Sequence, residues 1–236
     1  LAIGRYRDGG WSGMGPDLIA IAPWQAGDPP SKGTHLEASA LLLYSNTRGE
    51  DTTTNTLNGY QHSDEWEDGA WLTAGDRSTV IFVGAQGSGY LWYGFFSPNS
   101  DGMPCVEQDL TMVGCFNPDG SPCDASLSGY CEGNSPDSRG WWSSRWDSEI
   151  LFYNPADLAA VANGDMQPDE PQPYAVLDID DTLFLDGSVE PIMLGSGEQR
   201  RYRLGEIAFD RENGYLYILE KFADGAMPVV HVWQVK

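Results

Sequence analysis

The stretch Asp68-Gly-Ala-Trp71-Leu-Thr-Ala-Gly75 leads directly into the strand-forming run Ser78-Thr-Val-Ile-Phe-Val83. Sixty residues earlier, Asp8-Gly-Gly-Trp11-Ser-Gly-Met-Gly15 precedes another apolar run, Leu18–Ala22. Both copies read D-G-x-W-x-x-x-G, and a phrase that repeats ahead of equivalent strands indicates a structural repeat. We interpret it as the point where a repeated unit begins. In this interpretation the Asp caps a tight turn and the Trp packs between units.

Short strands are predicted in both units that the phrase opens. Ala38–Tyr44 is a short apolar run closed by turn residues, which favours a buried strand, and Glu149–Tyr153 echoes it in the second unit. Thr79–Val83 and Tyr90–Phe96 predict two strands around Gly84–Gly89, because those glycines can take the positive φ of a hairpin loop. The second unit is therefore expected to contain a hairpin at these glycines.

One short helix is predicted from Pro155 to about Ala162. Asn154 is suited to cap its N-terminus, Pro155 occupies the first helical position, and Gly164 stands just past its end. Thr47–Asp64, which is polar and rich in Thr and Asn, is expected to form an exposed excursion.

A third unit follows without the opening phrase. Tyr174–Ile179 is predicted as its first strand, and Asn213-Gly214 joins the strands Glu206–Phe209 and Tyr215–Leu219. Asn-Gly between two apolar runs is the strongest short hairpin signal. Val229–Trp233 is expected to close the unit.

Units of a few antiparallel strands with long connections suggest the blades of a β-propeller. The run Gly205-Glu-Ile-Ala-Phe-Asp-Arg-Glu-Asn-Gly-Tyr-Leu-Tyr-Ile-Leu-Glu220 resembles a hairpin of bacterial propellers, and Val230-His-Val-Trp-Gln-Val235 resembles their final outer strand. In its motifs and their order, most of the chain is similar to the C-terminal half of secreted bacterial β-propeller proteins without a settled function. The resemblance implies a fold and brings no catalytic residues with it.

The expected fold is thus all-β, a single propeller-like domain over residues 1–236 with one short helix and a long disulfide-stapled loop. About three to four blades are recognisable, with units at about 8–66, 67–164 and 165–236 and a Cys-rich insertion at about 97–140. Closed propellers have about four to eight blades, so either one blade is divergent or the chain is part of a larger propeller. The start at Leu1, without Met, favours a mature or truncated product from which an export signal has been removed. A β-sandwich of short strands is the alternative.

Net charge limits the partners. The formal charge of −22 and the pI near 4.1 exclude nucleic acid and anionic lipid surfaces, because both would repel the chain. No apolar run approaches the roughly 20 residues needed to span a bilayer, so no membrane insertion is expected. Divalent cations and basic surfaces remain as electrostatic partners, and the charge also serves to keep an extracellular protein soluble.

The cysteines predict an oxidising compartment. Cys105, Cys115, Cys123 and Cys131 fall in one stretch rich in Gly, Pro, Ser and Asn, and their spacing lacks the C-x2-C knuckles of most zinc sites. Two disulfides that staple a long loop explain them better, with three pairings open. The protein is therefore expected to be extracellular or periplasmic.

Two groups of residues are candidates for ligand contact. Trp141, Trp142 and Trp146 follow the cysteine loop outside the repeated phrase, so their faces are expected to be exposed and to stack on sugar rings or contact a protein. The strand ends, where a propeller places its site, are expected to contribute the polar residues Asp76, Arg77 and Glu206.

Calcium is the one cofactor that the sequence suggests. Asp178, Asp180, Asp181 and Asp186 resemble an EF-hand loop but fail its spacing, because Leu183 occupies the glycine position. An irregular oxygen site for calcium at these residues stays an expectation.

Catalysis finds less support than binding. No G-x-S-x-G elbow is present, and the three histidines are not at ligand spacing; His231, in the last strand, is expected to be packed and hydrogen-bonded. The predicted function is therefore that of a secreted non-catalytic binding or scaffold module with protein or glycan contacts, with a role in a larger assembly also open. The alternative is an extracellular hydrolase that acts on polysaccharide through carboxylates such as Glu206 or Asp76.

Overall fold

The computed structural model describes residues 2–3, 15–24, 27–44, 55–61, 63–95, 139–184, 204–224 and 227–236. The side chains of residues 2–3, 89–95, 139–145 and 222 are not described. These ranges contain ten strands, one α-helix and one 3-10 turn: β1 (Ala2–Ile3), β2 (Asp17–Ile21), β3 (Ala38–Leu43), β4 (Glu65–Ala74), β5 (Arg77–Phe95), β6 (Arg139–Tyr153), α1 (Pro155–Asn163), β7 (Ala175–Asp178), η3 (Asp180–Thr182), β8 (Leu204–Asp210), β9 (Tyr215–Asp224) and β10 (Met227–Gln234).

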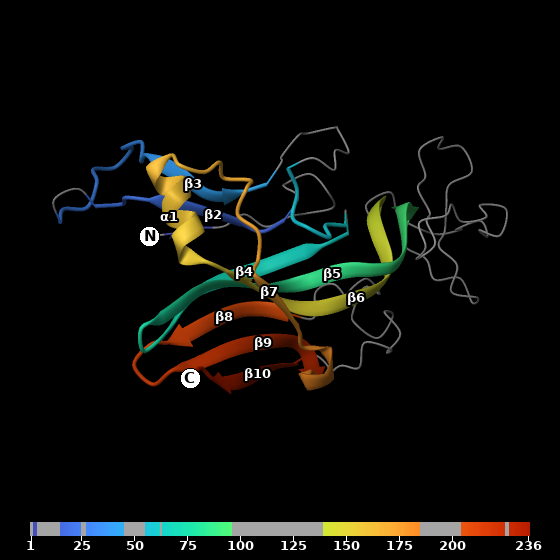
Figure 1. Ribbon diagram of the computed structural model, residues 1–236. Helices are drawn as coiled ribbons and strands as arrows, with labels where there is room; N and C mark the ends of the chain where they lie inside the picture. The colour runs from blue at the N-terminus through green and yellow to red at the C-terminus, as the bar shows by residue number, and fades with distance from the viewer. Residues whose placement is uncertain are drawn as a thin grey trace.

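The strands form three antiparallel sheets, and each sheet is a meander in chain order. The first contains β1-β2-β3, the second β4-β5-β6-β7 and the third β8-β9-β10 (Figure 1). The prediction of a mostly β protein with one short helix is confirmed. Across the described ranges, the three sheets do not close into a barrel or a complete propeller.

The four-stranded sheet lies in the middle of the stack. On one side it is covered by β2, β3 and α1, and on the other by the β8–β10 sheet (Figure 1). The side chains of β5 contribute to both faces of this sheet, because neighbouring residues of a strand point to opposite sides. Val80 and Phe82 belong to one core and Ile81 and Val83 to the other.

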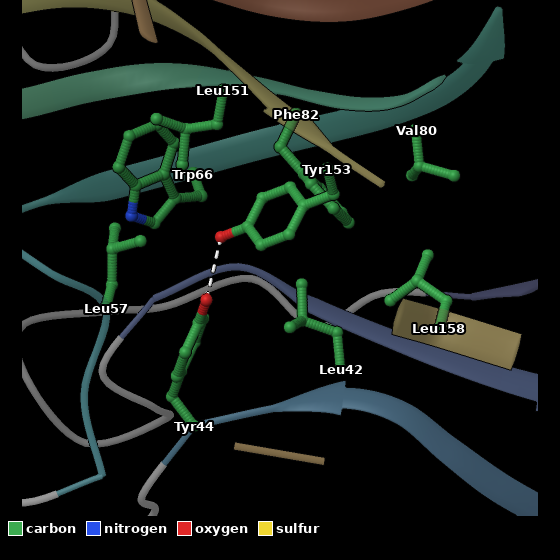
Figure 2. Packing of buried hydrophobic residues seen from close by; sticks show 9 residues of the cluster. All are labelled: Leu42, Tyr44, Leu57, Trp66, Val80, Phe82, Leu151, Tyr153 and Leu158. Carbon is green, nitrogen blue, oxygen red and sulfur yellow. Dashed lines mark hydrogen bonds between the residues drawn. The ribbon is translucent and has the colours of Figure 1, made fainter. Parts of the chain in front are cut away.

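The first core joins the first and second sheets around two tyrosines. The hydroxyls of Tyr44 and Tyr153 lie 2.9 Å apart, and that of Tyr44 donates to the carbonyl of Pro171 at 2.6 Å. Figure 2 shows the two rings among the buried apolar side chains of this core. Burial raises the pKa of both phenols above the ordinary value, so both stay neutral and hydrogen-bonded.

The second core joins the second and third sheets through aliphatic side chains. Its fully buried members include Ile81, Val83, Leu204 and Ile218. Burial of such side chains stabilises the packing of the two sheets by about 25 cal/mol per Å² of apolar area removed from water.

The helix and the Asn-Gly hairpin are confirmed. The Asn154 side chain accepts a hydrogen bond from the backbone of Ala156, and Gly164 ends α1 in the left-handed conformation at φ 80°. Gly214 likewise takes φ 70° in the turn between β8 and β9, where the Asp210 carboxylate accepts from two backbone amides.

The hairpin predicted at Gly84–Gly89 is wrong. β5 continues through these glycines to Phe95 and pairs with β6 along its length. Gly84 is required for packing rather than for a turn, since a Cβ there would stand 2.2 Å from the Glu65 carbonyl and 2.6 Å from the Trp66 ring. A missing side chain in a strand marks a close approach of its neighbours.

The role predicted for the repeated phrase is also wrong in its second copy. Asp68–Ala74 lies inside β4, and the turn follows it at Gly75-Asp76. Trp71 is 47% exposed, so it does not pack between sheets; Trp66, just before the phrase, is the buried tryptophan. The first copy lies outside the described residues except for Gly15.

Two further segments depart from the prediction. Ala175–Asp178, expected to begin the third unit, forms β7 and pairs with β6 as the edge of the central sheet. Leu57, in the segment expected to be an exposed excursion, is 2% exposed and packs in the first core. Both differences come from contacts between segments far apart in the chain.

Candidate functional site

Two irregular strands meet where the second sheet faces the third. The register of β4 shifts between Trp66 and Asp68, and that of β8 shifts between Leu204 and Ile207. The two strands contact each other, and the Asp68 carboxylate accepts a hydrogen bond from the Ile207 amide at 3.0 Å. Bulges re-aim side chains and are common next to active sites. The residues they present, Glu67 and Glu206, form the first candidate site.

Glu67 is the most perturbed acid of this site. Its Oε2 lies 3.1 Å from Nζ of Lys221, and its Oε1 is buried with no hydrogen-bond partner among the described residues. Burial raises the pKa of Glu67, the Lys221 ammonium lowers it, and the negative charges of Glu206 and Asp68 raise it further. Glu206 itself is exposed. A partly buried acid with a raised pKa beside a second, exposed carboxyl group is an arrangement that supports acid–base chemistry.

A second candidate site is a hollow of about 310 Å³ at one end of β5. It lies beside the β4–β5 turn, and residues of β4, β5, β6 and the end of the third sheet line it. Arg77 is the predicted site residue that lines it, and its guanidinium donates to the Lys236 carbonyl at 3.1 Å. Asp76 stands beside it in the exposed turn.

The third candidate site lies at the other end of β5. Pairing of β4 with β5 ends at Ala85 and pairing of β7 with β6 ends at Glu149, so beyond them β5 and β6 continue as a two-stranded arm (Figure 1). In the register of this arm, Trp92 is opposite Trp142 and Tyr93 is opposite Trp141.

Trp146 does not belong with the other two tryptophans. It is 2% exposed, and its indole nitrogen donates to the Ser63 carbonyl at 2.9 Å. The expectation of an exposed ring is wrong at this residue, because the Ser63–Asp64 segment is hydrogen-bonded to β5 and β6 at the base of the arm. Trp141 and Trp142 lie in the arm, with only their backbone described.

The acidic residues expected to bind calcium lie at the β6–β7 edge. Glu149 pairs directly with Asp178, and the Asp180 carboxylate accepts from the Ser148 amide at 3.0 Å. Burial, with the charges of Asp147, Asp178 and Asp180, raises the pKa of Glu149 to about 7. Asp181 is exposed in η3, whereas Asp186 lies outside the described residues. In the described ranges, no group of His, Cys, Asp or Glu side chains is arranged to hold a metal ion.

His231 is hydrogen-bonded, as expected. Its Nε2 lies 2.6 Å from the buried Glu220 carboxylate, which also accepts from the Phe184 amide at 2.9 Å. The pair ties β9, β10 and the segment after η3 together, which is a structural role. The four cysteines lie outside the described residues.

The sequence placed Glu206, Asp76 and Arg77 in one group, but they are divided between two sites. Glu206 lies at the paired bulges, and Arg77 lines the hollow with Asp76 beside it. Sequence reasoning missed Lys221 and Tyr174 as site residues. No local pattern marks either one, because Lys221 is brought to Glu67 by the packing of two sheets and Tyr174 is brought to the hollow by its backbone bond to Phe152.

In the described part of the chain, no helix is both long and apolar enough to cross a membrane. Comparison with protein-family models, with curated proteins and with solved structures finds no match to this chain.

Proposed function

We propose that this protein is a secreted β-propeller-type module that binds a glycan or protein partner through the aromatic arm formed by β5 and β6, and that it has no catalytic role. The observation that carries the proposal is the register of the arm, which places Trp92 with Trp142 and Tyr93 with Trp141. The propeller reading itself rests on meander topology. Three consecutive meanders that stack face to face are the arrangement of successive blades.

The arm suits a binding role because no described strand accompanies it on either edge. Aromatic residues on a two-stranded arm suit contact with a partner, because a large ring has one apolar face to cover. Aromatic rings also dominate the energetics of protein interfaces, and their faces accept the apolar side of a sugar ring. Secretion rests on the cysteine-rich segment and the acidic composition.

The test measures binding of the intact chain to a panel of immobilised polysaccharides and to extracellular proteins. The double variant Trp141→Ala/Trp142→Ala is compared with Trp71→Ala, which removes an exposed tryptophan of β4. The arm variant is expected to lose binding while the control keeps it. Equal binding by both variants, or no binding across the panel, contradicts the proposal.

A second candidate function is favoured by the Glu67 site. A buried carboxyl with a raised pKa, 3.1 Å from Lys221 and near the exposed Glu206, has the parts of a general acid and a second carboxylate. On this alternative the protein is an extracellular hydrolase of polysaccharide. In this alternative Glu206 is one of the two catalytic carboxylates, as proposed from the sequence, and Glu67 is the other in place of Asp76.

Release of reducing ends from polysaccharide tests the hydrolase. Activity that falls by about 100-fold or more in both Glu67→Gln and Glu206→Gln supports it, since acid–base catalysis contributes about 10²–10⁴-fold. Asp76→Asn is the matched control, because that acid is exposed in the turn. Activity that is absent in the unmodified chain, or that survives in both variants, removes this alternative.

A further inference from the structure

The hollow beside the β4–β5 turn differs in charge from the rest of the molecule. The chain has 35 acidic and 13 basic residues, yet the described residues that line the hollow include Arg77 and Lys236 and no Asp or Glu. Its volume of about 310 Å³ is at the small end of ligand sites, which run from about 300 to 1,000 Å³. A cationic hollow on an acidic protein selects for a small anionic ligand, because the remaining surface repels one.

Arg77 is held in a defined position at the edge of the hollow. One terminal nitrogen of its guanidinium donates to the Lys236 carbonyl at 3.1 Å, and with that bond made to the described part of the chain the other N–H groups can meet a ligand. A planar guanidinium binds a carboxylate with two parallel hydrogen bonds, a geometry that an ammonium cannot supply.

An aromatic platform stands in the same hollow. Tyr174 is 62% exposed, and its ring lies 6.3 Å from that of Phe152, whose carbonyl accepts a hydrogen bond from the Tyr174 amide at 2.8 Å. The backbone bond and the ring contact keep the tyrosine in place. A large exposed ring costs free energy in water, and it gains by stacking on the apolar C–H face of a sugar.

Hydroxyl groups complete the lining. Thr73 and Ser78 are directly paired across β4 and β5, and both line the hollow. The Thr79 hydroxyl already donates to the Tyr153 carbonyl at 3.0 Å, so it is committed to the fold. Thr73 and Ser78 therefore offer the short polar contacts that fix the orientation of a polyhydroxylated ligand.

We propose that this hollow binds an acidic sugar, a uronic acid residue whose carboxylate pairs with Arg77 while its ring stacks on Tyr174. Lys236 supplies the second positive charge. The site lies roughly 45 Å along β5 from the aromatic arm, at about 3.3 Å per residue. It is therefore independent of the arm, and failure of one proposal leaves the other standing.

The experiment is calorimetric titration of the intact chain with a short oligogalacturonate. Three ligand arms are compared: the free acid, its methyl ester of the same length, and a sulfated neutral oligosaccharide. The free acid is expected to bind, with an affinity that falls as salt rises, and the ester to bind at least about tenfold more weakly. Equal affinity for acid and ester overturns the proposal, as does binding of the sulfated sugar alone or no binding of the acid at millimolar concentration.

Protein variants locate the site. Arg77→Ala and Arg77→Lys are each expected to weaken binding by about tenfold or more, since Lys keeps the charge but not the paired hydrogen bonds. Arg211→Ala removes the same charge from the exposed β8–β9 turn and is expected to bind like the unmodified chain. Tyr174→Ala is expected to weaken binding with no change in its salt dependence. If Arg77→Ala binds with unchanged affinity, or if Arg211→Ala loses as much affinity, the ligand does not bind in this hollow and the proposal is overturned.

Discussion

The Asp68 carboxylate of β4 accepts a hydrogen bond from the Ile207 amide of β8 at 3.0 Å. Its other oxygen accepts from the Gly69 amide at 2.8 Å, so one side chain is fixed in its own strand and bonded to the next sheet. Both strands are bulged at this point, which frees the Ile207 amide from the ladder. The Asp in the second copy of the repeated phrase is therefore a link between sheets rather than a turn cap.

Loss of this link is expected to destabilise the fold. Asp68→Ala leaves the Ile207 amide without its acceptor, which costs about 1–3 kcal/mol for a part-buried donor. Chemical denaturation measures the change. Asp76→Ala, in the exposed turn, is the control and is expected to change stability by less than about 0.5 kcal/mol. Equal stability of the two variants argues against the link.

The tyrosine pair predicts an asymmetric loss. Tyr44 donates to the Pro171 carbonyl, so Tyr153 must be the donor in the bond between the two hydroxyls. Tyr44→Phe removes both bonds and strands a carbonyl of the buried Pro171, whereas Tyr153→Phe removes one bond. Tyr44→Phe is expected to lower the free energy of unfolding by about 1–3 kcal/mol, the cost of leaving a buried carbonyl without its donor. Tyr153→Phe is expected to lower it by less. A larger loss in Tyr153→Phe contradicts this network.

Gly84 tests whether β5 is continuous. Gly84→Ala places a Cβ against the Glu65 carbonyl and is expected to cost about 3 kcal/mol or more, because one backbone must move away from the other. Gly75→Ala, in the turn at φ 61° with open space around it, is expected to cost about 1–2 kcal/mol of backbone strain. If Gly84 lay in a hairpin loop, as its sequence suggests, its replacement would be the milder of the two.

Glu149 predicts a dependence of stability on pH. Its pKa is about 7 in the folded chain and near 4.5 when unfolded, so between these values the folded state holds a proton that the unfolded state has lost. The contribution of Glu149 to stability therefore falls as pH rises from about 4.5 to 7. Glu149→Gln is expected to match the unmodified chain at pH 4.5 and to melt about 2–4 °C higher at pH 8, after allowance for partial exposure of the group. Melting curves with the same difference at both pH values contradict the assignment.

Calcium at Asp178, Asp180 and Asp181 stays a prediction from the sequence. Thermal melts with calcium and with a chelator test it at pH 8, where Glu149 is ionised beside them. A higher melting temperature with calcium supports the site, and identical curves remove it.

The sequence predicted what local chemistry decides. Asn154 and Gly164 bound the helix, and Asn213-Gly214 turns the third sheet, because capping and positive φ depend on residues a few positions apart. Gly84 was wrongly predicted to lie in a turn, because the reason for a glycine there is the close approach of Glu65 and Trp66 on another strand. β7 was assigned to the wrong sheet for the same reason.

The candidate sites were predicted less well than the strands. Arg77 and Glu206 were found as charged residues at strand ends. The other members of their sites, Tyr174 and Lys221, depend on contacts between segments far apart in the chain. Trp146 was expected to be exposed with Trp141 and Trp142, because the sequence does not show that the distant Ser63 segment packs on it.

The most direct test of the account is to remove the arm and keep the sheets. Ser88 and Arg145 are paired across β5 and β6, so a short Asn-Gly turn can join them in place of residues 89–144. The shortened chain is measured against the polysaccharide or protein identified with the unmodified chain. We predict that it melts cooperatively and has lost this binding. A folded, shortened chain that binds with an unchanged Kd would contradict the account.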